Sequence, residues 1–95
     1  MIRHIVLFSA KDPNDVETIV SALRRLREIP DVDHLEVVRN AKLDQYSDEI
    51  DVIVYGEFAD AEALARYKAH PIYQQTIAVV RPLRDLRIAV DYQAS

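Results

Sequence analysis

The sequence of 95 residues contains no cysteine, no tryptophan and a single glycine, Gly56. Without cysteine, disulfide bonds and thiolate metal sites are excluded, and this composition suits a reducing cytoplasm, where we expect the protein to act. No apolar run approaches the roughly 20 residues that span a bilayer. The apolar stretch at the N-terminus is also too short for a secretory signal. We therefore expect a protein that is neither membrane-bound nor secreted.

Phosphate loops, nucleophile elbows and dinucleotide fingerprints are also absent, so nucleotide-dependent and serine-hydrolase chemistry are not expected. The chain has 12 Lys and Arg against 16 Asp and Glu, and the net charge of −4 argues against nucleic-acid binding. The nearest thing to a basic cluster is expected to be the solvated flank of a helix. It comprises Arg66, Lys68, Arg81, Arg84 and Arg87.

The pattern of apolar residues predicts one α+β domain over residues 1–95. Strands are predicted at residues 2–9, 33–39, 51–58 and 86–92, and helices at 13–29, 61–70 and 72–80. Asp12 and Pro13 form a typical helix start, whereas Pro30 and Pro71 each end a helix. Gly56 lies inside a predicted strand, which indicates a bulge or a close approach by another backbone. The order of elements is the βαββαβ pattern of ferredoxin-like folds, with the helices on one face of the sheet.

The first strand is apolar on both of its faces. One face receives Ile2, His4, Val6 and Phe8, and the other receives Arg3, Ile5, Leu7 and Ser9. The third strand is apolar on both faces as well. Because the helices cover only one face of the sheet, the second cover is expected to be another copy of the chain. The sequence therefore predicts a homodimer with an enclosed pocket.

Four fragments carry a family resemblance across nearly the whole chain. They are Met1–Phe8, Tyr67–Pro71, Arg81–Leu83 and Val90–Tyr92. Together, in this order and spacing, they resemble the stress-responsive A/B barrel (Dabb) family. The resemblance implies one Dabb domain with a ferredoxin-like protomer whose homodimer closes into an α/β barrel. Most members of that family have no established activity.

A plant branch of the family contains a cofactor-free polyketide cyclase, which performs an intramolecular aldol condensation in the barrel lumen. Tyr67 and His4 match two polar positions of its pocket. Tyr73 stands where the cyclase has its second catalytic residue, a histidine, and Val52 falls near a further pocket histidine. Since two of the four positions differ, the resemblance does not carry the cyclase activity over to this chain.

His4 is the strongest candidate for chemistry, because an imidazole titrates near neutral pH and can move a proton. We expect it to face the space between subunits. The alternative is a structural histidine whose nitrogens bind the backbone or a tyrosine. Tyr67 and Tyr73 could each donate a phenol proton toward a developing oxyanion, or merely pack. Asp91 is expected to pair with an arginine, either Arg3 or Arg87.

Two further histidines have plainer interpretations. His70 lies where a helix breaks at Pro71, and a capping role competes there with a role in the pocket. His34 lies among acidic residues, but no second histidine has a ligand-like spacing, so a solvated turn is expected. No metal or cofactor is predicted.

The leading hypothesis is a homodimer that binds a small, mostly apolar or phenolic molecule. His4 and Tyr67 are the candidate catalytic residues, and the candidate ligand-binding residues are Val6, Val54, His70 and Tyr73. The polar segment 40–49 could cover the pocket mouth. The alternatives are a cofactor-free enzyme, cyclase-like or monooxygenase-like, and a structural, stress-protective oligomer. A cavity above roughly 300 Å³ would favour a ligand site, and a packed interior with His4 bound to backbone would favour the structural protein.

Overall fold

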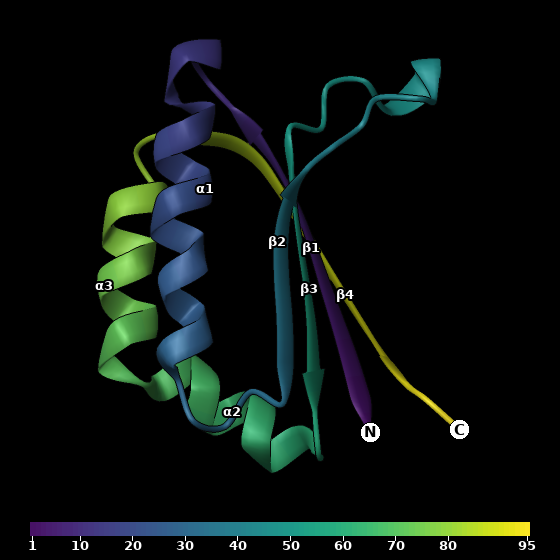
Figure 1. Cartoon of the computed structure of the whole chain (residues 1–95), viewed down its shortest axis with the longest axis vertical. Coiled ribbons are helices and arrows are strands. Elements are labelled where there is room, and N and C mark those ends of the chain that lie inside the picture. The colour runs from purple at the N-terminus through teal and green to yellow at the C-terminus, as the bar shows by residue number, and fades with distance from the viewer.

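A computed structural model describes all residues, 1–95, and shows one four-stranded sheet with its helices on a single face (Figure 1). In chain order the elements are β1 (Ile2–Ala10), a 3₁₀ turn (Pro13–Asp15), α1 (Val16–Arg24) with a 3₁₀ extension (Arg25–Glu28), β2 (His34–Arg39), a 3₁₀ turn (Gln45–Ser47), β3 (Val52–Phe58), α2 (Ala61–Ala69), α3 (Pro71–Val80) and β4 (Arg84–Gln93). The ferredoxin-like order is confirmed, and the predicted bounds hold to within a few residues. No helix is long and apolar enough to cross a membrane.

The helix starts follow the capping residues of the sequence. The carboxylate of Asp12 accepts a hydrogen bond from the amide of Asn14, and Asp60 accepts one from the amide of Ala63. α2 ends before His70, whose extended backbone is the conformation expected of a residue that precedes proline. A new helix therefore starts at once, in a different direction.

The sheet has the strand order β2-β3-β1-β4, and every neighbouring pair is antiparallel. Gly56 interrupts neither ladder of β3, so the bulge we considered there is absent. The alternative, a close approach by another backbone, is also absent, because the atoms that crowd this position belong to side chains. A Cβ atom at this position would lie 3.0 Å from Cε2 of Phe58 and 3.3 Å from Cδ1 of Leu35. The register shift occurs instead between β1 and β4, beyond the pair of Phe8 and Arg87.

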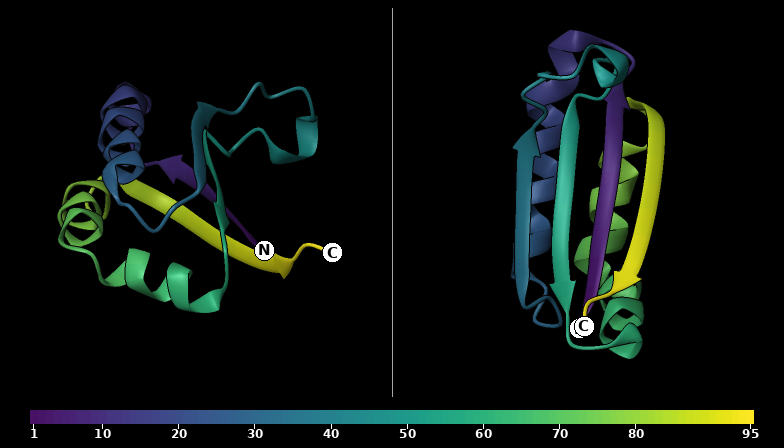
Figure 2. Two further views of the ribbon diagram at one scale, coloured as in Figure 1. Left: turned by 60° about the horizontal axis from the view of Figure 1, so that its bottom comes forward. Right: turned by 90° about the vertical axis from the view of Figure 1, so that its right-hand side faces the viewer.

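The helices enclose a core of 16 buried hydrophobic residues against one face of the sheet. α1 packs on β2 and β3, α2 runs across one end of the sheet, and α3 packs mainly on α1 (Figure 1 and Figure 2). The helix side of β4 is consequently less covered than the rest. This difference in cover determines where the protein is open.

The opposite face of the sheet carries no helix, and Figure 2 shows all four strands uncovered on that side. Apolar side chains of every strand share this bare face: Val38, Ile53, Tyr55, Ile5, Leu7, Ile88, Val90 and Tyr92. The three on β4 are 45%, 50% and 46% exposed, respectively. The exposed apolar face predicted from the two-sided strands is therefore present.

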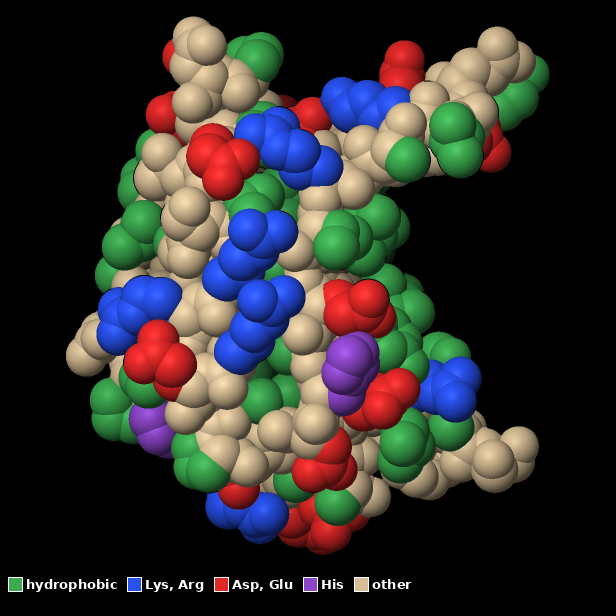
Figure 3. Space-filling model, viewed as in Figure 1, with side chains coloured by type: hydrophobic (Ala, Val, Ile, Leu, Met, Phe, Trp, Pro, Cys, Tyr) green, Lys and Arg blue, Asp and Glu red, His purple; other side chains and the backbone are tan.

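The segment 40–49 projects outward on the same side as the bare face (Figure 1). Near its tip, Leu43 is 93% exposed and Tyr46 is 85% exposed. Figure 3 shows a hollow beneath this projection, with hydrophobic side chains along its wall. A second surface could therefore be received between the segment and the sheet.

Candidate functional site

His4 lies on the face of β1 that the helices cover, and only 1% of its surface is exposed. We expected it to face the space between subunits, and that expectation is wrong. The row of His4, Val6 and Phe8 points into the core, whereas Ile5 and Leu7 point to the bare face. Both rows are apolar, so alternation alone does not distinguish the covered row from the other.

The carboxylate of Asp91 is the partner of His4, with 2.5 Å between Nδ1 and Oδ1. The two residues are direct neighbours across β1 and β4, which brings their side chains to one side of the sheet. The expected pairing of Asp91 with an arginine is wrong. Arg3 instead donates a hydrogen bond to the hydroxyl of Tyr92, at 3.2 Å. The alternative expectation is wrong as well, because the ring nitrogens of His4 form no hydrogen bond with the backbone or with a tyrosine.

This pairing determines the form of the imidazole. A carboxylate only accepts hydrogen bonds, so Nδ1 of His4 carries a proton and Nε2 of the neutral ring holds a lone pair. Burial lowers the pKa of His4 below its usual value, and the carboxylate of Asp91 offsets only part of that change. The positive charges of Lys68 and Arg87 also lower the pKa of His4. The result is a neutral, oriented base near pH 7.

An aromatic cluster surrounds the ring of His4. The ring of Tyr67 lies 4.8 Å from that of Phe58, 5.1 Å from that of Tyr73 and 6.5 Å from His4, between centroids. Burial raises the pKa of Tyr67, so its hydroxyl stays protonated and remains a hydrogen-bond donor. The one hydrogen bond of the His4 side chain is made by Nδ1, so Nε2 has no partner within the protein, and neither has the hydroxyl of Tyr67. A hydrogen-bond acceptor and a hydrogen-bond donor thus lie close together, and neither has a partner within the protein.

A small apolar niche brings together five of the six candidate residues: His4, Val6, Val54, Tyr67 and Tyr73. Its volume is about 10 Å³, room for about one water molecule. The sixth candidate, His70, lies outside. Its Nδ1 accepts a hydrogen bond from the amide of Ile72 at 3.1 Å, so it caps the start of α3.

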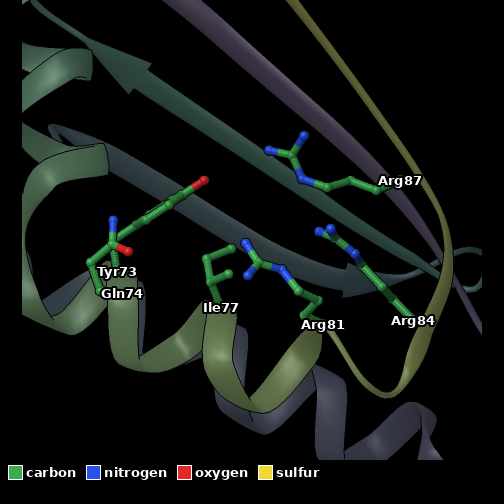
Figure 4. A pocket seen from close by; sticks show the side chains of 6 residues that line it. All are labelled: Tyr73, Gln74, Ile77, Arg81, Arg84 and Arg87. Atoms are coloured by element: carbon green, nitrogen blue, oxygen red, sulfur yellow. The ribbon is translucent and has the colours of Figure 1, made fainter.

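The niche adjoins a larger cavity of about 220 Å³ between α3 and β4, which we call the mouth (Figure 4). The mouth is lined by Tyr73, Gln74, Ile77, Arg81, Arg84 and Arg87. Tyr73, Ile77 and Arg87 line both spaces, so the ring of Tyr73 lies where one space meets the other. Together the two spaces fall short of the roughly 300 Å³ expected of a preformed ligand site.

The three arginines of the mouth correct our expectation of a solvated helix flank. Arg84 and Arg87 are three residues apart on β4, and in a regular strand they would point to opposite faces. The register shift pairs Arg87 with Phe8 but Arg84 with Ala10, and this returns both side chains to the helix side. These arginines are recognisable as a cluster in the sequence but were assigned to a helix flank, because a bulge cannot be read from residue spacing. The one signal of the cluster was the density of arginine around Pro82.

Two other expectations about the site concern residues that lie elsewhere. The segment 40–49 was expected to cover the pocket mouth, but it projects on the opposite side of the sheet and lines neither cavity. His34 is exposed, with its Nε2 3.3 Å from a carboxylate oxygen of Glu36. No three metal-ligating side chains gather anywhere in the chain.

The fold and the site define a ferredoxin-like α+β protomer in which a buried histidine between sheet and helices is paired with a partly exposed aspartate. The sequence profile of the Stress responsive A/B Barrel Domain family matches residues 2–94. This chain therefore belongs to the stress-responsive A/B barrel family.

Known proteins agree with this assignment. The chain is 30% identical to a stress-response A/B barrel domain-containing protein of Arabidopsis thaliana, over 99% of this chain but 37% of that protein. A dimeric ferredoxin-like protein of unknown function from Thermobifida fusca is 27% identical, with a TM-score of 0.83 over 98% of this chain and 90% of that one. A putative antibiotic biosynthesis monooxygenase from Nitrosomonas europaea is 18% identical, with a TM-score of 0.81 over 99% and 98% of the two chains, a likeness of fold alone.

The protonation state of His4 is directly testable. We expect its pKa, followed by imidazole NMR shifts, to lie below the usual value of about 6.5. Because the unfolded chain then binds a proton more readily, stability should be complete above about pH 6.5 and fall as the pH drops toward the pKa of the folded state. Asp91→Asn removes a carboxylate that favours the charged ring, so it should lower the pKa of His4 further. An unchanged or higher value in that variant would contradict this account.

Proposed function

We propose that this chain acts as a homodimer that binds a small, mostly apolar molecule between its sheet and its helices. The dimer is supported by the bare apolar face of the sheet and by the exposed apolar tip of segment 40–49. Both lie on one side of the protomer (Figure 3). Several structural neighbours are described as dimeric. Two copies that meet through their bare faces would remove this apolar surface from water.

The dimer predicts a selective effect of charge on the bare face. Val90 is half exposed in the protomer, so Val90→Lys should fold but place an ammonium group in the interface. We expect sedimentation to show a shift from twice 10.9 kDa toward 10.9 kDa. Val79→Lys is the matched control, because Val79 is 46% exposed on α3, away from that face. A wild-type chain that sediments as a monomer at micromolar concentration would refute the dimer.

The ligand site is supported by one observation above all. Nε2 of His4 and the hydroxyl of Tyr67 lack partners in the protein, and both residues line the niche that adjoins the mouth. A molecule that enters between α3 and β4 would pass Tyr73 and Ile77 on its way to the niche. Displacement of the half-buried Tyr73 ring would then join the two spaces. The cavity size limits the ligand to a small one unless this ring moves.

Native mass spectrometry of protein purified from its own host tests this site. We expect a dimer that carries a small molecule, which is released on denaturation. Tyr73→Trp should fill the passage between mouth and niche and lose the bound mass while the dimer persists. Val79→Trp places the same bulk elsewhere on α3 and should keep the ligand. A ligand-free wild-type dimer would instead support the structural, stress-protective oligomer.

The pair of His4 and Asp91 also favours a second candidate, cofactor-free proton transfer. In this reaction Nε2 would remove a proton from a carbon beside a carbonyl group. The C–H electron pair would pass into the enolate, and the phenol of Tyr67 would stabilise its oxygen by donating a hydrogen bond. Asp91 would stabilise the imidazolium that forms. No metal, flavin or other cofactor is needed for these steps.

Hydrogen exchange on a simple ketone tests the base. We expect the protein to accelerate exchange of the methyl protons of acetophenone in D₂O, as followed by NMR. His4→Gln should abolish the acceleration, and Asp91→Asn should reduce it by about 10-fold or more, as expected when a base loses its orienting partner. His34→Gln alters an exposed histidine and should change nothing. An equal loss of exchange rate in the His34 variant, or no acceleration by the wild type, would rule out the proton-transfer function. The proposal of ligand binding would be unaffected.

A further inference from the structure

Three arginines converge on the mouth without a negative partner. Figure 4 shows that the side chains of Arg81, Arg84 and Arg87 extend into the space between α3 and β4, toward Tyr73 and Ile77. None of the three guanidinium groups makes an ion pair or a hydrogen bond within the chain. This is unusual in a protein that carries 16 acidic and 12 basic side chains. Acidic partners were available in the sequence, but the fold places none there.

This arrangement has an electrostatic cost. Burial lowers the pKa of Arg84, and the positive charges of Arg87 and Arg81 lower it further. A like-charged cluster on a partly enclosed surface is destabilising until a negative group enters it. Guanidinium groups bind the oxygens of carboxylate and phosphate groups in a bidentate manner, and several of them can surround one such group. The mouth is therefore complementary to an oxyanion.

The rest of the site is apolar, and this restricts the kind of anion. Beyond the arginines, Tyr73 and Ile77 lead to a niche lined by eight hydrophobic residues among ten. A bare inorganic ion would leave this surface unused. A nucleic acid would leave the apolar surface unused as well, and the net charge of −4 disfavours binding to a phosphate backbone.

We propose that the ligand of this site is an amphipathic acid. Its carboxylate or phosphate group binds to Arg81, Arg84 and Arg87, and its apolar body lies along Tyr73 and Ile77 toward the niche of His4. This inference rests on the proposed ligand site and specifies which end of the molecule enters first. The apolar end lies innermost, and the acid stays at the surface, where its charge is paired rather than buried.

Three probes of equal chain length test the proposal: octanoate, octyl phosphate and the neutral 1-octanol. We expect at least one of the acids to bind the wild-type protein about tenfold or more tightly than octanol, by calorimetry at low salt. Added salt should weaken that binding. The side-chain NMR signals of Tyr73 and Ile77 should shift on binding. The two acids distinguish a carboxylate ligand from a phosphate ligand.

Variants of matched charge complete the test. Arg84→Gln/Arg87→Gln should abolish the preference for the acid and leave the affinity for octanol unchanged. Arg25→Gln/Arg39→Gln removes the same charge from exposed positions and should keep the preference. The acid inference is overturned if octanol binds as tightly as both acids, or if both double variants lose the preference for the acid equally. The proposed apolar site would stand in either case. If no probe shifts Tyr73 or Ile77, the ligand site fails as well.

Discussion

The architecture depends on a mismatch between strands that are apolar on both faces and helices that cover only one of them. β4 links the two faces most directly. Val90 points to the bare face, and its neighbour Asp91 points to the helix side and holds His4. A second copy that packs on the bare face would also restrain β4 at the edge of the sheet. In the proposed dimer, the contact and the orientation of the candidate base would thus be coupled through two consecutive residues.

The position of the open site follows from how the helices pack. α3 packs against α1 rather than against the strands, so the helix side of β4 is partly uncovered. The mouth forms in that gap, and the bulge on β4 turns Arg84 toward it. His4 lies on β1, the strand next to β4, where the helices cover the sheet almost completely. The site therefore runs from a charged, hydrated rim to an apolar end within a short distance.

Much of the fold could be predicted because its signals are local. The cap at Asp12, the break at Pro71 and the two-sided first strand led to the order of elements and to the bare face. The site was harder, because it depends on register. Nothing local to Asp91 indicates that it lies opposite His4, and the shift that gathers Arg84 and Arg87 has no signature in their spacing. Val6, Val54, Tyr67 and Tyr73, which are candidates on sequence grounds, line one niche with His4, and their role in binding stays a prediction.

The state of His4 is also an argument against a purely structural role. A histidine that served only to hold the strands together would need no second ring nitrogen facing an open space. Here Nδ1 is bonded, but Nε2 is not, and the hydroxyl of the adjacent Tyr67 is not bonded within the protein either. Two polar groups of complementary acidity that line one niche without a protein partner are the feature on which the proposed ligand site rests.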